Sequence, residues 1–155
     1  MKAISPIAAH TLAAALVVAA ARLSIAFAAD DDVDTAPALQ AAQAWLAEVD
    51  AGSYAKSWDD ASALFQGAMP QDEWVKKVAT VRSPLGPVVA RKLRSVSYRK
   101  ELPGAPTGEY VVLDYETRFE NRPISVETVT PMRDKDGRWR GSGPATSSSR
   151  STARK

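Results

Sequence analysis

The alternation of side chains between Glu109 and Arg140 is the feature that most constrains the fold of this chain. From residue 113 to residue 120, uncharged side chains alternate with charged ones. A period of two is typical of a β-strand with one buried and one solvated face. Residues 120–123 interrupt this pattern. A second alternating set then follows, made of Ile124, Val126, Thr128, Thr130 and Met132. After it, residues 134–137 supply a hairpin turn. The stretch therefore predicts a β-meander.

The first half of the chain carries apolar residues at helical spacing. Three short amphipathic helices are predicted, with stripes formed by Leu39, Ala42, Leu46 and Val49, then by Tyr54, Trp58, Ala61 and Phe65, and last by Trp74, Val75, Val78 and Val81. The segment RSPLGP at residues 82–87 separates them from a basic strand at residues 88–100. This order predicts an α+β fold, in which three helices pack on a curved antiparallel sheet of about four strands.

The N-terminus resembles an export signal. Residues 4–21 are almost wholly apolar, follow Lys2, and precede the small-residue site Ala26-Phe27-Ala28. We predict a signal peptide at residues 1–28, an acidic lead at 29–36, a single domain at 37–140 and a disordered polar tail at 141–155. The protein would be periplasmic or secreted, with no membrane span after cleavage. The alternative is an uncleaved N-terminal anchor.

The composition argues against several functional classes. Without Lys2 and Arg22, 18 basic residues balance 18 acidic ones, so the charge gives no argument for nucleic-acid binding. The chain has no cysteine, and its one histidine, His10, lies in the predicted signal. The mature domain would therefore lack the commonest general base, a thiol nucleophile and the usual ligands of zinc. No metal and no cofactor are expected.

Six residues are candidates for lining a pocket between the helices and the sheet: Trp45, Trp58, Trp74, Arg82, Tyr115 and Glu127. The tryptophans lie on the predicted helical stripes, where they can form the core or line a cavity. Glu127 lies where the alternation weakens, so either face of the sheet is open to it. Inside an apolar cavity it could serve as a general base. Alternatively, an ion pair with Arg82 or Arg91 would close the domain.

Three functions are compatible with these residues. The first is a small binding or accessory domain without catalysis, whose cavity or open sheet face holds a small apolar ligand or a partner protein of the envelope. The second is a cofactor-free lyase- or isomerase-like enzyme with Glu127 or Asp50 as its only acid–base group. The third is a structural protein that the basic strand retains on the cell envelope. The oligomeric state stays open, a homodimer included.

Several strings resemble one family of small exported bacterial proteins, the domain-of-unknown-function family 4019. These strings are Ala44-Trp45-Leu46, Val49–Gly52 with Tyr54, Ser57-Trp58, Phe65, Glu73-Trp74, Arg82 with Pro84–Gly86, Arg91, Glu109–Val112, Phe119, Glu127–Thr130 and Asp136–Arg140. The resemblance implies an exported domain whose helices and curved sheet are similar to the cone of nuclear transport factor 2-like and cystatin-like proteins. It implies no activity.

The chain departs from the family pattern after Arg140. Members of the family that this chain resembles typically end in a strand similar to Val-x-Gly-Tyr-Phe-Ile-Lys. In this chain, residues 144–150 read PATSSSR instead. In another reading frame, codons for these residues can encode Gly-Tyr-Phe-Ile-Lys and a stop. We hypothesise that a frameshift produced the residues after about Arg140 and truncated the last strand. Resequencing the locus and finding no extra or missing base before the Pro144 codon would contradict this.

Overall fold

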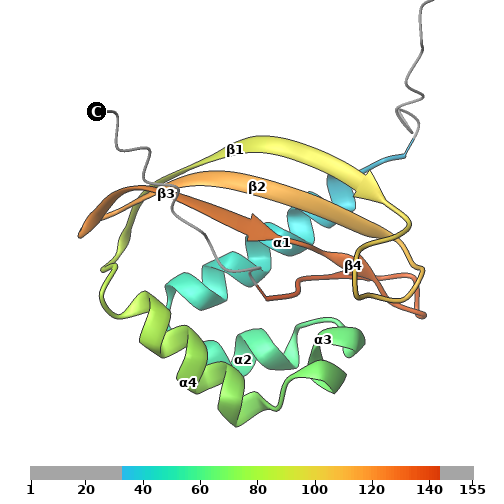
Figure 1. Ribbon diagram of the computed structural model, residues 1–155, viewed down its shortest axis with the longest axis horizontal. Coiled ribbons are helices and arrows are strands. Elements are labelled where there is room, and N and C mark those ends of the chain that lie inside the picture. The colour runs from blue at the N-terminus through green and yellow to red at the C-terminus, as the bar shows by residue number, and fades with distance from the viewer. Residues whose placement is uncertain (1–32, 144–155) are drawn as a thin grey trace, which may run out of the picture.

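The structure, a computed structural model, describes residues 33–143. In this part of the chain, four helices precede the five strands of one antiparallel sheet (Figure 1). The helices are α1 (Ala36–Asp50), α2 (Tyr54–Asp59), α3 (Ala63–Ala68) and α4 (Gln71–Arg82). The strands are β1 (Val88–Arg99), β2 (Tyr110–Phe119), β3 (Arg122–Val129), β4 (Met132–Arg133) and β5 (Trp139–Arg140). The predicted α+β fold is confirmed. The predicted signal peptide, most of the acidic lead and the tail beyond residue 143 lie outside the described residues.

The stretch predicted as the second helix forms two short helices, α2 and α3. Ser62 divides them, because its backbone is extended, with φ −61° and ψ 149°. Its hydroxyl accepts a hydrogen bond from the N–H of Phe65 at 3.3 Å, which caps α3. Its own N–H donates to the carbonyl of Gly141 at 2.9 Å. The start of α3 is therefore tied to the C-terminal segment, and the helical period breaks there.

The sheet is arranged around β2, which pairs with β1 on one side and with β3 and β4 on the other. Leu113 pairs with Val129, and Tyr110 pairs with Met132, so β3 and β4 follow the same register along β2. β5 then pairs with β4, where Met132 lies opposite Arg140. β5, the last strand among the described residues, has only two residues.

The core lies between the helices and one face of the sheet. Figure 1 shows α1 running across the strands, with α2, α3 and α4 on its far side. The buried apolar cluster consists of Ala38, Ala42, Trp45, Leu46, Val49, Trp74, Val78, Val111, Leu113, Tyr115 and Val129. Burial of each large side chain in this set stabilises the fold by roughly 1.5–3 kcal/mol.

The apolar residues of β3 face solvent, whereas their alternating pattern in the sequence suggests that they face the core. Ile124 and Val126 are 72 % and 48 % exposed, whereas Ser125 between them is buried. The pairing with β2 is the cause, since it sets Val126 opposite the exposed Glu116. A one-residue change of register would turn every side chain of the strand to the other face. Glu127 consequently shares the inner face with Ser125, toward the helices.

Gly141 and Gly143, which the sequence assigns to the tail, pack against the aromatic core. A Cβ at Gly143 would stand 2.6 Å from the ring of Phe65 and 3.1 Å from that of Trp74. A Cβ at Gly141 would overlap the side chain of Trp45. Real Cβ atoms do not approach so closely, so the chain can cross these rings only where it has no side chain.

Candidate functional site

The six candidate residues fall into two groups in the structure. Trp45, Trp58 and Trp74 lie on α1, α2 and α4 and belong to the aromatic packing between the helices. Arg82, Tyr115 and Glu127 lie at the end of α4, on β2 and on β3. The two groups have different chemistry, and each is described in turn.

The indole groups of the three tryptophans all have partners. Trp45 and Trp74 are 3 % and 4 % exposed, and their ring centroids lie 5.7 Å apart. Their Nε1–H groups donate to the carbonyl and the hydroxyl of Ser57, at 2.7 and 3.0 Å. Trp58, which is partly buried, donates to the carbonyl of Met69 at 2.7 Å. These contacts join the helices to one another and satisfy the polar edge of each ring.

Asp50, Arg82, Arg91 and Glu127 form one charged cluster where α1, α4, β1 and β3 meet. Arg91 donates from Nε to Glu127 at 2.9 Å, and from Nη1 and Nη2 to Asp50 at 2.6 and 3.0 Å. Arg82 pairs with Asp50 and, at 3.1 Å, with Glu127. The predicted pairing of Glu127 with Arg82 or Arg91 is confirmed, and it involves both arginines. Although Arg91 belongs to the basic strand, its side chain is only 16 % exposed and points inward.

The members of the charged cluster stabilise one another's charges. Burial lowers the pKa of Arg91, but the hydrogen bonds that Asp50 and Glu127 accept outweigh it, so the pKa lies above its ordinary value. Thr117 also donates its hydroxyl hydrogen to Glu127. Glu127 therefore accepts hydrogen bonds from Arg91 and Thr117 and forms an ion pair with Arg82, so its oxygens are engaged within the protein.

Two hydroxyl groups beside the cluster have no hydrogen-bond partner among the described residues. They belong to Tyr115, which is 4 % exposed and pairs with Glu127 in the register, and to Ser125, which is 6 % exposed. Burial raises the pKa of Tyr115, while the charge of Arg91 lowers it and that of Glu127 raises it. The phenol therefore stays protonated at neutral pH and is no candidate for a base.

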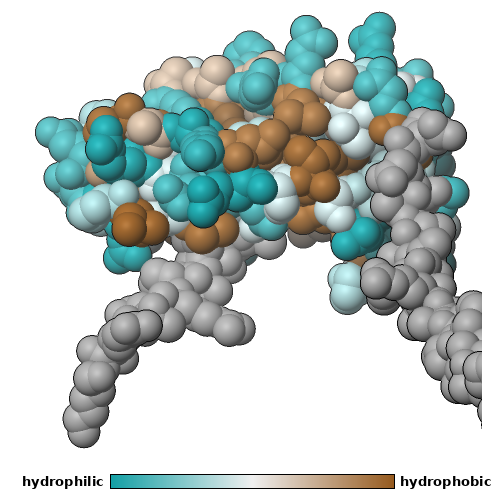
Figure 2. Space-filling view, turned by 90° about the horizontal axis from the view of Figure 1, so that it is seen from above, coloured by the Kyte–Doolittle hydropathy of each residue, from teal (hydrophilic) through white to brown (hydrophobic). Residues whose placement is uncertain are grey.

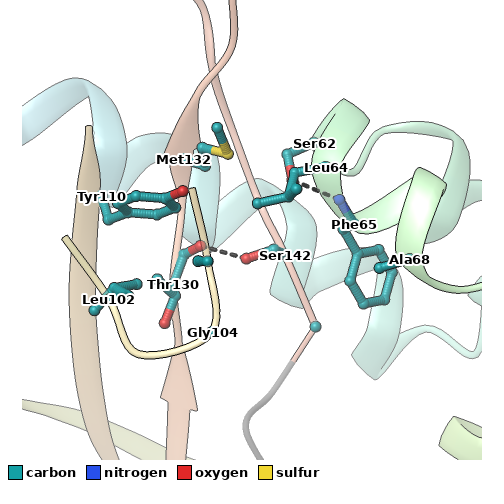
Figure 3. Close-up of a pocket in the computed structure, with 12 residues that line it drawn as sticks. Ser62, Leu64, Phe65, Ala68, Leu102, Gly104, Tyr110, Thr130, Met132 and Ser142 are labelled. Carbon is teal, nitrogen blue, oxygen red and sulfur yellow. Dashed lines mark hydrogen bonds between the residues drawn. The ribbon is translucent and has the colours of Figure 1, made fainter. Parts of the chain in front are cut away.

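One hollow in the surface lies between α3, the loop after β1 and the strands β2 and β4. It has a volume of about 300 Å³. Figure 3 shows Leu102, Tyr110 and Met132 on one side of it and Leu64 and Phe65 on the other. The wall is completed by Ser62, Ala68, Gly104, Ala105, Thr130, Ser142 and Gly143. Most of these side chains are apolar, so we call this site the apolar hollow.

The second hollow borders the charged cluster and has a volume of about 320 Å³. It is lined by Val49, Asp50, Ala51, Gly52, Tyr54, Arg82, Ser83, Gly86, Pro87 and Val88. Of the six candidate residues, only Arg82 lines either of the two hollows. The guanidinium of Arg82 is already paired with Asp50 and Glu127, so the charged groups in this wall are engaged with one another.

The sequence analysis missed the apolar hollow. Its wall comes from a short helix, a loop at residues 102–105 and the ends of strands, so no sequence period joins its residues. The one signal was Leu102, a large apolar residue in a loop that otherwise contains proline, glycine and small residues.

Two further features concern the part of the chain that the structure describes. No helix between residues 33 and 143 is long and apolar enough to cross a membrane. Within the same residues, no three acidic or other ligating side chains gather where they could hold a metal ion.

A family model matches residues 41–143 of this chain, and its description is protein of unknown function (DUF4019). Searches of curated proteins and of solved structures found no match. The matched segment runs from α1 through the whole sheet to the glycine that packs on Phe65, and it covers more than half of the chain. The chain belongs to the DUF4019 family of proteins of unknown function.

Proposed function

We propose that this chain is an exported, non-catalytic binding domain that holds a small apolar ligand, or an apolar side chain of a partner protein, in the apolar hollow. The observation that carries this proposal is a hollow of about 300 Å³ with a largely apolar wall. Small-molecule sites are typically concave, mostly apolar and about this size or larger. The export follows from the apolar segment at residues 4–21 and the A-x-A site after it.

The polar groups in the wall of the apolar hollow support this choice. Tyr110 donates its phenolic hydrogen to the carbonyl of Pro106 at 2.6 Å, and Ser142 donates to the carbonyl of Thr130, between β3 and β4. The hydroxyl of Ser62 accepts from a helix N–H. Because these groups are occupied within the protein, the hollow offers a ligand mainly apolar surface, and binding is driven by removing that surface from water.

The alternative of a lyase- or isomerase-like enzyme is less well supported. It needs Glu127 or Asp50 as an acid–base group, and both carboxylates are ion-paired with Arg82 and Arg91. Neither carboxylate lines the apolar hollow. A general base must lie within hydrogen-bond reach of the proton that it removes. Here the two carboxylates are directed at arginine side chains.

The test is a titration with N-phenylnaphthylamine, an apolar fluorescent probe. Ala68 is exposed and lines the hollow, so Ala68→Trp should fill it and weaken probe binding about tenfold or more, which is about 1.4 kcal/mol. Ala55 is an exposed alanine on the short helix α2 and lies outside the hollow, so Ala55→Trp is the matched control. Equal probe affinity in both variants would contradict the proposal.

A further inference from the structure

No charged side chain among the described residues lines the apolar hollow. The residues of its wall are apolar, glycine or hydroxyl-bearing. Arg133, which follows Met132 of the wall in the sequence, pairs with Glu109 at 3.1 Å, so this guanidinium is already engaged. An ionised ligand would therefore leave water without a counter-charge, which costs far more free energy than the transfer of an uncharged one. The wall favours a ligand without charge.

Four residues of the wall carry a hydroxyl group, and three of these groups are engaged within the protein. Tyr110 donates to the carbonyl of Pro106, and Ser142 donates to the carbonyl of Thr130. Ser62 accepts from a helix N–H and is only 1 % exposed. The hydroxyl of Thr130 has no hydrogen-bond partner among the described residues. Because Thr130 is half-buried and its hydroxyl oxygen keeps accessible surface, this one group is left for a ligand.

The chain on either side of Thr130 fixes its position. Val129 pairs with β2, and the carbonyl of Pro131 accepts from the N–H of Val111 at 3.0 Å. The carbonyl of Thr130 itself accepts from Ser142, and its branched Cβ restricts rotation of the side chain. A hydroxyl that is already held in place loses little entropy when it bonds to a ligand, so it can contribute to selectivity.

We propose that the apolar hollow takes an uncharged ligand with one hydrogen-bonding oxygen, such as a ketone or an ester, and that the hydroxyl of Thr130 donates to this oxygen. The inference rests on the proposed function, because it names the ligand class of the same hollow. In Figure 3, Thr130 lies on the side of Leu102, across from Phe65. The apolar part of the ligand packs between these two sides. A second polar group on the ligand would lose its bonds to water without replacement, since the other hydroxyls are engaged.

The test compares three naphthalenes that carry, at the same ring position, a methyl ketone, an isopropenyl group or a carboxylate. The three substituents have nearly the same shape and differ in polarity and charge. Each compound is titrated at neutral pH against N-phenylnaphthylamine bound to the full chain. The ketone should bind about tenfold or more tightly than the carboxylate, because the wall offers no counter-charge. A carboxylate that binds as tightly as the ketone would overturn the proposal.

Thr130→Val removes the hydroxyl and keeps the shape of the side chain. It should weaken binding of the ketone about three- to tenfold, as expected for one hydrogen bond, and leave the isopropenyl compound unchanged. Thr107→Val is the matched control, since Thr107 is exposed in the loop after β1 and lies outside the hollow. An equal effect of Thr130→Val on the ketone and the isopropenyl compound would show that Thr130 only shapes the wall.

A second variant changes the preference for charge. Ala68 is exposed and lines the hollow, so Ala68→Lys gives the wall a cation. It should tighten binding of the carboxylate about threefold or more and leave the isopropenyl compound nearly unchanged. Ala55→Lys, outside the hollow, should have no effect on either. If Ala68→Lys and Ala55→Lys acted alike, the absence of charge in the wall would not set the selectivity.

The outer face of the sheet is a second apolar surface, and its contribution has to be separated from that of the hollow. Looking down on the strand layer, Figure 2 shows apolar side chains gathered in a band across the middle of the view, between hydrophilic ends. On β3, Ile124 and Val126 are 72 % and 48 % exposed. The double variant Ile124→Ser with Val126→Ser should keep the affinity for all three compounds. A loss of affinity in it would place the ligand on the sheet and overturn the proposal.

Failure of this inference can be told apart from failure of the proposed function. If Ala68→Trp weakens the probe but the three naphthalenes bind equally, the hollow binds ligands without this selectivity, and only the inference is overturned. If Ala68→Trp leaves the affinity for the probe unchanged, the hollow is not the binding site, and both are overturned.

Discussion

The Nε atom of Arg91 lies 2.9 Å from Oε2 of Glu127, and this bond joins β1 to β3 across the inner face of β2. The same two side chains reach the helices, because Asp50 ends α1 and Arg82 ends α4. One charged cluster thereby connects both long helices to two strands, β1 and β3. We conclude that these four residues join the helices to the sheet and close the domain.

Removing one member of the charged cluster should therefore destabilise the fold. Glu127→Gln removes the negative charge that pairs with Arg82 and Arg91, at a side chain that is only 13 % exposed. Breaking a buried ion pair by removing one partner costs about 3–5 kcal/mol of stability. Asp50→Asn acts at a carboxylate that is 26 % exposed, where water substitutes for part of the lost interaction, so the expected loss is smaller, about 1 kcal/mol. Urea unfolding of the two variants measures this order. A larger loss for Asp50→Asn would contradict it.

Two buried tyrosines should respond in opposite ways to loss of the hydroxyl. Tyr110 is 2 % exposed and donates to the carbonyl of Pro106 at 2.6 Å, so Tyr110→Phe should lower the free energy of unfolding by about 1 kcal/mol. Tyr115 is 4 % exposed and its hydroxyl has no partner among the described residues, so Tyr115→Phe should leave stability unchanged or raise it. Thermal unfolding at neutral pH compares them. An equal loss in both would show that Tyr115 has a partner.

Tyr115 should also make stability depend on pH in the alkaline range. Burial raises its pKa in the folded protein above the ordinary value near 10. The contribution of Tyr115 is therefore complete below about pH 10 and is lost as the pH rises through the raised folded value. Tyr115→Phe should flatten the fall in the free energy of unfolding above about pH 10. An unchanged slope in that variant would assign the alkaline loss to other groups.

Gly143 should tolerate no side chain. A Cβ there would stand 2.6 Å from the ring of Phe65, so Gly143→Ala should cost about 1–3 kcal/mol through overpacking. Gly67 lies on α3 with no atom within 4 Å of such a Cβ, so Gly67→Ala should stabilise the protein by about 0.5–1 kcal/mol. Denaturant midpoints of the two variants test this. A harmless Gly143→Ala would mean that residues 141–143 do not cross the aromatic rings.

The parts of the fold that depend on local pattern could be predicted from the sequence. The stripe on α1 and the alternation on β2 reflect burial of one face, and both elements form where that burial predicts. The facing of β3 could not be predicted in the same way, because Ile124 and Val126 suggested an inner face and the register with β2 turned them outward. The contact of Ser62 with Gly141, which separates α2 from α3, joins residues far apart in the sequence and has no local signal.

The candidate site was only partly predictable for the same reason. Opposite charges invite a pairing, so an ion pair of Glu127 with Arg82 or Arg91 could be proposed from residue types alone. That Asp50 joins both arginines depends on where α1 ends relative to the sheet. The apolar hollow depends on packing between a short helix and a loop, and periodicity describes neither.

The measurement that tests the central claim most directly is the affinity for N-phenylnaphthylamine of two variants, Glu127→Gln and Ala68→Trp, at a temperature where both are folded. If the apolar hollow binds ligands and the charged cluster only closes the domain, Glu127→Gln should keep the probe affinity and unfold more easily. Ala68→Trp should lose affinity about tenfold or more and keep its stability. If Glu127→Gln lost affinity for the probe and Ala68→Trp retained it, the account would be contradicted. The probe would then bind at the charged cluster and not in the apolar hollow.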